Sequence, residues 1–174
     1  MRRYVIVILL LSALMLFGPG CVSEPGMDKA KFSDLNRIAR ELQTSLASGK
    51  PCDVPDTLLE RLASGTTALQ DKTASQAERD VIKAYSNLVA TYKDGLLLCK
   101  YRTNLSQFKF VPKGRIYVFQ ELDPLVQKYD LTTESHVYGP TGLHWRSIDE
   151  RSIKVIWDSA EFQLKIIENM VNYN

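Results

Sequence analysis

Residues that catalyse reactions at neutral pH are scarce in this chain of 174 residues. It contains two histidines, His136 and His144, and both lie far along the sequence from every cysteine. It has no G-x-S-x-G, H-E-x-x-H or phosphate-binding G-x-x-x-x-G-K motif. A hydrolase needs a nucleophile activated by a base that a third group orients, and a metal site needs clustered ligands. The sequence therefore predicts no enzyme, no metal site and no cofactor.

A surplus of charge of one sign is also missing. The chain has 22 Lys and Arg against 20 Asp and Glu, and Arg2 and Arg3 account for the difference. Nucleic-acid binding needs extra cations gathered on one patch or along one helix. We therefore expect no nucleic-acid partner. The hydrophobic fraction of 45% is ordinary for a single globular domain.

The first twenty residues have the three-part layout of a secretory signal peptide. A short positive segment at residues 1–3 precedes an apolar run at residues 4–17, and Gly18-Pro19-Gly20 follows. This run is shorter than the roughly 18 residues that a transmembrane helix requires. We expect residues 1–20 to be a cleaved signal peptide, the alternative being an uncleaved membrane anchor.

The junction Gly20-Cys21 resembles the lipobox of bacterial prolipoproteins. The resemblance covers the first 21 residues and implies that Cys21 receives a diacylglyceryl group and becomes the new N-terminus. The family usually has Leu, then Ala or Ser, where this chain has Gly18 and Pro19. Ordinary signal cleavage, which would leave Cys21 as a free thiol, is the alternative. Val22 rather than Asp follows the cysteine, which by the same resemblance implies an outer-membrane protein facing the periplasm.

The number of cysteines predicts a disulfide. Three cysteines in an exported protein leave one unpaired, and lipidation of Cys21 would account for it. Cys52 follows the first expected helix and Cys99 lies near the end of the third. In a bundle of consecutive antiparallel helices these two positions are at the same end. We therefore predict a bond between Cys52 and Cys99, the alternative being two buried free thiols.

Apolar residues at three- and four-residue spacing predict helices within four segments, which are 28–48, 53–70, 75–99 and 147–171. Two of them open with capping boxes, Ser75-x-x-Glu78 and Ser147-x-x-Glu150. The fold class that follows is all-α, with a bundle of four to five helices. We expect residues 28–174 to form this single domain and residues 21–27 to be the lipidated tether.

Two segments lack this spacing. Near residues 105–120 we expect a small β-hairpin or an irregular insertion, turning at Val111-Pro112-Lys113-Gly114. The alternative extends the third helix to about Gln107 and places a further helix at 118–129. Residues 131–146 contain Gly139-Pro140-Thr141-Gly142 and are predicted to be a loop.

Two features predict where a protein partner binds. The first is the end of the bundle formed by the loop from Tyr138 to Trp145 and the start of the last helix. Trp145 lies beside Leu143 in this loop, and large exposed aromatic residues often anchor interfaces. Trp145 can instead fold back as a lid on its own bundle. The apolar face of the last helix is widened by Phe162 and Ile166, so that helix is either central in the bundle or covered by a partner.

The function that follows is a non-enzymatic envelope lipoprotein, attached to the membrane by its lipid and acting as an accessory interaction subunit of a periplasmic or outer-membrane assembly. The alternative is a periplasmic helical bundle that binds a small ligand, with Tyr85, Tyr92 and Tyr101 as its polar lining.

Overall fold

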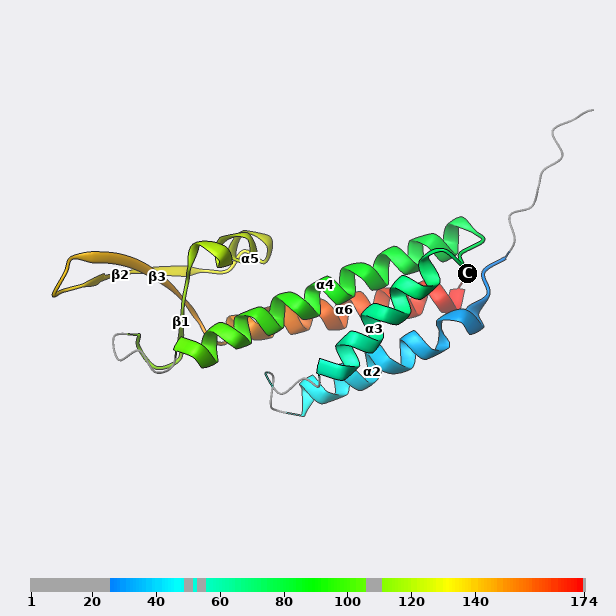
Figure 1. Cartoon of the computed structure of the whole chain (residues 1–174), viewed down its shortest axis with the longest axis horizontal. Helices are drawn as coiled ribbons and strands as arrows, with labels where there is room; N and C mark the ends of the chain where they lie inside the picture. The colour runs from blue at the N-terminus through cyan, green and yellow to red at the C-terminus, as the bar shows by residue number, and fades with distance from the viewer. Residues whose placement is uncertain (1–25, 49–51, 53–55, 106–110, 174) are drawn as a thin grey trace, which may run out of the picture.

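The computed structural model describes residues 26–48, 52, 56–105 and 111–173. Four long helices run alternately up and down along one axis (Figure 1). They are α2 (Ser33–Ala47), α3 (Asp56–Gln70), α4 (Gln76–Leu105) and α6 (Ser152–Tyr173), and a 3-10 helix η1 (Lys29–Phe32) precedes the first. The predicted helical bundle is therefore confirmed. Cys21 and residues 1–20 lie outside the described residues.

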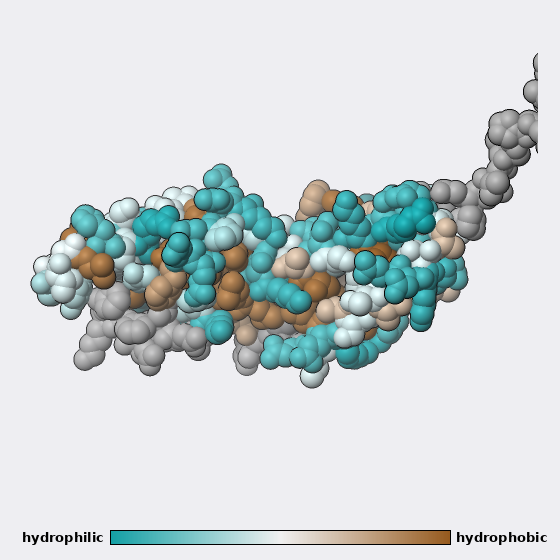
Figure 2. Space-filling view, turned by 45° about the horizontal axis from the view of Figure 1, so that its top comes forward, coloured by the Kyte–Doolittle hydropathy of each residue, from teal (hydrophilic) through white to brown (hydrophobic). Residues whose placement is uncertain are grey.

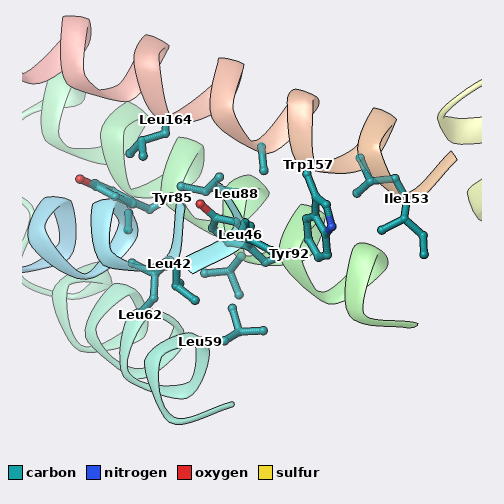
Figure 3. Packing of buried hydrophobic residues seen from close by; sticks show 14 of the residues in the cluster. Leu42, Leu46, Leu59, Leu62, Tyr85, Leu88, Tyr92, Ile153, Trp157 and Leu164 are labelled. Carbon is teal, nitrogen blue, oxygen red and sulfur yellow. The ribbon is translucent and has the colours of Figure 1, made fainter. Parts of the chain in front are cut away.

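The core of the bundle forms where α4 packs against α6. Tyr92 of α4 and Trp157 of α6 are buried, with ring centroids 6.3 Å apart (Figure 3). A Cβ atom at Gly95 would lie 2.2 Å from the indole ring of Trp157. Glycine therefore allows α4 to approach the indole closely.

The predicted disulfide is present. The sulfur atoms of Cys52 and Cys99 are 2.05 Å apart and close a loop with a sequence separation of 47 residues. The bond joins the segment between α2 and α3 to α4, as the antiparallel arrangement of these helices requires.

The capping box at the start of α4 is confirmed on one side and altered on the other. The backbone N–H of Glu78 donates to Ser75 Oγ at 3.2 Å, as expected. The Glu78 carboxylate accepts from the backbone N–H of Ala74 at 2.6 Å instead of from that of Ser75. It also accepts from the N–H of Asp28 at 3.0 Å and from Lys31 Nζ at 2.9 Å. Glu78 thus ties the start of the described chain to α4.

A three-stranded antiparallel sheet lies beyond the bundle, in the order β1-β3-β2. Its strands are β1 (Arg115–Tyr117), β2 (Thr133–Tyr138) and β3 (Leu143–Asp149). The all-α prediction is therefore wrong in this region, and so is the loop predicted over residues 131–146. The cause is that β3 pairs on both sides, and neither pairing is visible in local helical spacing.

The insertion expected near residues 105–120 contains β1, which pairs with β3 about thirty residues further along the chain. Residues 106–110, the other half of the predicted hairpin, lie outside the described residues. Where a helix at 118–129 was the alternative, the chain forms the short η2 (Gln120–Leu122) and α5 (Asp123–Lys128). Pro124 suits the first turn of α5 because its missing N–H has no helical acceptor there.

The prediction that Ser147 and Glu150 form a capping box at the start of the last helix is wrong. Ser147 lies within β3, is fully buried, and binds other strands instead of capping a helix. The last helix begins five residues later, at Ser152. Asp149 makes the turn before it by accepting the backbone N–H of Arg151 at 2.8 Å.

The described chain begins and ends at the same end of the molecule, and the hairpin of β2 and β3 projects from the opposite end (Figure 1). Lys29 Nζ donates to the carbonyl oxygen of Asn172 at 2.8 Å, which joins the two ends of the described chain. No helix in the described part of the chain has both the length and the apolar composition needed to cross a bilayer.

Candidate interaction site

The candidate site is the end of the molecule built by the three strands. Side chains of residues directly opposite one another in antiparallel strands share a face. The pairs His136 with Trp145 and Tyr138 with Leu143 therefore lie on one face of the hairpin, which we call the aromatic face. Tyr117 of β1 lies opposite Ser147 and shares this face. The predicted interaction residues Leu143 and Trp145 are thus brought to one surface.

Stacked rings cross the aromatic face from strand to strand. The ring of Trp145 lies between that of His136, with centroids 4.1 Å apart, and that of Tyr117, with centroids 5.3 Å apart. Phe119 extends the row, at 4.5 Å from Tyr117 and 5.6 Å from Tyr101 at the end of α4. The row connects the projecting hairpin to the bundle through side-chain contacts, which favours a fixed orientation of the hairpin.

A polar cluster centred on the buried Ser147 lies beside this row. Ser147 Oγ is 2.7 Å from His136 Nε2 and accepts from Arg115 Nε at 3.0 Å. Arg115 also forms an ion pair with Glu134 at 3.0 Å. Because Ser147 is fully buried, its hydroxyl is not accessible to a substrate, so the cluster joins the three strands and does not form a catalytic dyad.

The opposite face of the sheet is exposed near the tip, at Val137, and is buried in its part nearest the bundle. Ile116 and Ile148 are fully buried there, and Arg146 forms an ion pair with Asp123 at the start of α5. Partner contact is therefore left to the tip of the hairpin and its aromatic face.

The hairpin tip exposes apolar side chains from both strands. The exposed fractions are 58% for Val137, 54% for Leu143 and 38% for Tyr138. Gly142, with a φ of 68°, makes the turn between them. Apolar surface is visible among hydrophilic residues at this end of the molecule (Figure 2). Tyr138 and Leu143 share the aromatic face, and Val137 lies on the opposite face at the same tip. Exposed apolar side chains gathered on a projecting element are typical of an interaction site.

The two predicted interaction residues have different roles. Leu143 is exposed, as an interface residue would be, whereas only 7% of Trp145 is exposed. Trp145 packs onto the rings of its own sheet and so matches the lid alternative, although it covers the sheet and not the helical core. Sequence reasoning included Tyr138 in the candidate loop but missed Val137. The available signal was the alternation of Leu143 and Trp145 after a Gly-Pro-Thr-Gly turn, with the β-favouring Val137 and Tyr138 before it, a pattern typical of a hairpin.

A second concave surface lies between the end of α2 and the start of α6. This cleft has a volume of about 580 Å³, and Leu46, Ile153 and Trp157 form its apolar part. Arg102, which donates to Glu150 at 3.1 Å, lies at its edge. The cleft is a candidate for a small ligand.

The tyrosines expected to line a ligand site lie elsewhere. Tyr85 and Tyr92 are fully buried in the core, and burial raises the pKa of both phenols. The Tyr92 hydroxyl donates to Gln43, whose side chain lines the cleft, at 3.3 Å. Tyr101 packs against Phe119 in the row of rings. Among the described residues, no group of three or more His, Cys, Asp and Glu side chains is arranged to hold a metal ion.

No family model, curated protein or solved structure matches this chain. The assignment of function therefore depends on the geometry of the molecule itself.

Proposed function

We propose that this protein is a non-enzymatic, lipid-anchored accessory subunit of a bacterial cell-envelope assembly, and that its hairpin tip binds a protein partner. In this proposal Cys21 carries the lipid, and the protein is attached to the outer membrane and faces the periplasm. The membrane and one envelope protein are its two partners.

The observation that carries the proposal is the placement of the hairpin tip at the end opposite the start of the described chain (Figure 1). Helix α4 starts at the chain-entry end, where Glu78 binds Asp28, and has 30 residues. At 1.5 Å per residue, its length is about 45 Å. An anchor at Cys21 would thus leave the exposed tip at the end of the molecule farthest from the bilayer, where a partner can reach it.

The disulfide supports an oxidising location for the domain, since such bonds persist in the periplasm and are rare in the cytosol. The elongated bundle supports a role in presentation, because it places the hairpin tip at the end opposite the start of the described chain (Figure 1).

Two measurements test the proposal. Mass spectrometry of the N-terminus from native membranes should find Cys21 as the first residue and carrying lipid. An unmodified thiol, or an intact Met1, would contradict the anchor.

The second measurement tests the tip. A double variant, Val137→Ser with Leu143→Ser, should abolish recovery of the envelope partner after crosslinking in cells, while melting changes little because both side chains are exposed. Phe162→Ser is the matched control, since it removes an apolar side chain that is 64% exposed on α6. Equal loss of the partner in the control, or full recovery in the double variant, would place the contact elsewhere.

The cleft between α2 and α6 favours a second candidate, a bundle that binds a small apolar ligand beside Trp157. Native mass spectrometry of the protein extracted from its membrane tests it. A bound small molecule that is lost in Leu46→Trp, which fills the cleft, would support this second function.

A further inference from the structure

Strand β2 is an edge of the sheet. The order β1-β3-β2 places β3 in the centre, so among the described strands β2 has a neighbour on one side alone. An edge strand presents a row of backbone N–H and C=O groups to which another strand can pair.

One hydrogen bond between β1 and β3 shows which backbone groups of β2 point outward. The backbone N–H of Val118 donates to the carbonyl oxygen of Arg146 at 2.9 Å, so the backbone of Arg146 points toward β1. Ser135 is the residue of β2 directly opposite Arg146. Because the backbone of Arg146 bonds to β1, Arg146 and Ser135 form a non-hydrogen-bonded pair. The two members of such a pair direct their N–H and C=O groups away from each other. The N–H and C=O of Ser135 therefore point outward, and by alternation so do those of Thr133 and Val137.

This edge lacks the features that usually prevent pairing. The strand Thr133–Tyr138 contains no proline, no lysine and no bulge, and Ser135 and Val137 are exposed. Its one acidic side chain, Glu134, forms an ion pair with Arg115 of its own sheet. Within the described residues, the outward backbone groups of Thr133, Ser135 and Val137 make no hydrogen bond.

We propose that the outer edge of β2 receives an extended strand of the partner protein, which pairs with the backbone of Thr133, Ser135 and Val137 and extends the sheet by one strand. The inference rests on the proposed function, because it names how the hairpin end binds its partner. Main-chain pairing of this kind supplies affinity, and alternate side chains supply specificity.

The chemistry of the incoming strand follows from the residues beside which it would lie. On the aromatic face it meets Glu134, His136 and Tyr138 in turn. A basic side chain suits the position next to the Glu134 carboxylate, which is 60% exposed, and an apolar one suits the position next to Tyr138.

A second copy of this chain fits less well than another protein. Antiparallel pairing of β2 with its own copy would direct the two helical bundles away from each other along the long axis (Figure 1). The two chain-entry ends would then lie at opposite ends of the dimer, and one membrane could not hold both anchors. The partner strand is therefore assigned to a different protein.

The experiment uses the full chain in its native cells, with a photo-crosslinking phenylalanine analogue in place of Val137. Two variants are compared in this background, Ser135→Pro and Ser135→Ala. Proline removes the outward N–H of Ser135 and leaves the bonds to β3 intact, and edge strands tolerate it. Alanine removes the hydroxyl and keeps the N–H, so it is the matched control.

We expect a crosslinked adduct with another protein in the parent and in Ser135→Ala, and a yield lower by about tenfold or more in Ser135→Pro, since a backbone hydrogen bond is lost and the ring blocks the strand. Thermal melting of Ser135→Pro must match that of Ser135→Ala. If the melting temperatures differ, the crosslinking yields of Thr133→Pro and Thr133→Ala are compared instead, because the N–H of Thr133 also points outward.

Three results would overturn the inference, and they separate it from the proposed function. An adduct that persists in the proline variants means side-chain contact without strand pairing, and leaves the proposed function in place. An adduct of twice the chain mass identifies a second copy as the occupant. The absence of any adduct in the parent removes both strand addition and the hairpin as the site of partner binding.

Discussion

Protonation of Glu78 is predicted to control the acid stability of the fold, because its carboxylate is 1% exposed and holds two backbone N–H groups and Lys31. The N–H of Ala74 is the largest cause that lowers the pKa of Glu78 to about 2 from the ordinary 4.5, and the Lys31 ammonium and the N–H of Asp28 add to it. Burial alone acts in the opposite direction, since it disfavours the charged form.

The direction in which stability changes with pH follows from the difference in the pKa of Glu78 between the folded and the unfolded chain. In the unfolded chain Glu78 takes up its proton near pH 4.5, whereas in the folded protein it does so near pH 2. The stabilisation is therefore present above about pH 4.5 and is lost as the pH falls toward 2. At 1.36 kcal/mol per pKa unit the full shift corresponds to about 3 kcal/mol, and we expect about 2 kcal/mol because the partly exposed Lys31 is screened by solvent.

The assay is urea unfolding of the wild-type protein and Glu78→Gln from pH 7 to pH 2.5. Glutamine keeps the shape and removes the charge, so the variant should be less stable by about 2 kcal/mol at pH 7. The difference between the two proteins should shrink steadily below pH 4.5 and be small at pH 2.5. Other carboxylates with a lowered pKa, such as Asp149, do not contribute to the difference in unfolding free energy because both proteins carry them. Glu41→Gln is the control, since Glu41 is exposed and forms an i,i+4 pair with Arg37. A difference that does not depend on pH would refute the reasoning.

Three further predictions concern the packing of the fold. Alkylation of the unfolded protein without reductant should leave Cys52 and Cys99 unlabelled, and Cys99→Ser should lower stability by about 4 kcal/mol in the chain-entropy model, which chemical denaturation measures. Trp145→Ala should cost about 3 kcal/mol, because its buried ring lies between two others, and a thermal melt within a degree of wild type would instead favour an interface role. Gly95→Ala should cost about 2 kcal/mol by forcing the Trp157 ring to move, and restored stability in Gly95→Ala with Trp157→Phe would identify that contact as the cause.

The parts of the fold that depend on local pattern were predictable from the sequence. Helices α2, α4 and α6 have apolar residues at helical spacing over many turns, and burial of Leu42, Leu88 and Leu164 follows that spacing. The disulfide was also predictable, because the number of cysteines and the alternation of helix direction together leave one pairing that fits.

The site was predictable only in part. The sequence identifies Leu143 and Trp145 as large apolar residues outside the helices, but its local pattern predicts a loop where the structure has strand β3. The pattern Ser147-x-x-Glu150 followed by Ile153 satisfies a capping box as well as a strand that enters a helix. What distinguishes the two is the pairing of Ser147 with Tyr117, a contact between residues far apart in sequence.

By itself the sequence determined the helical bundle, the disulfide and the absence of recognisable catalytic motifs, since these depend on residue spacing and composition. Only the tertiary structure decided which apolar residues are exposed, that Trp145 packs between two rings, and that β2 is left as an edge. The physical reason is that strand pairing and burial are set by contacts between distant segments. A residue such as Val137 has the same local sequence whether a neighbouring strand covers it or water does.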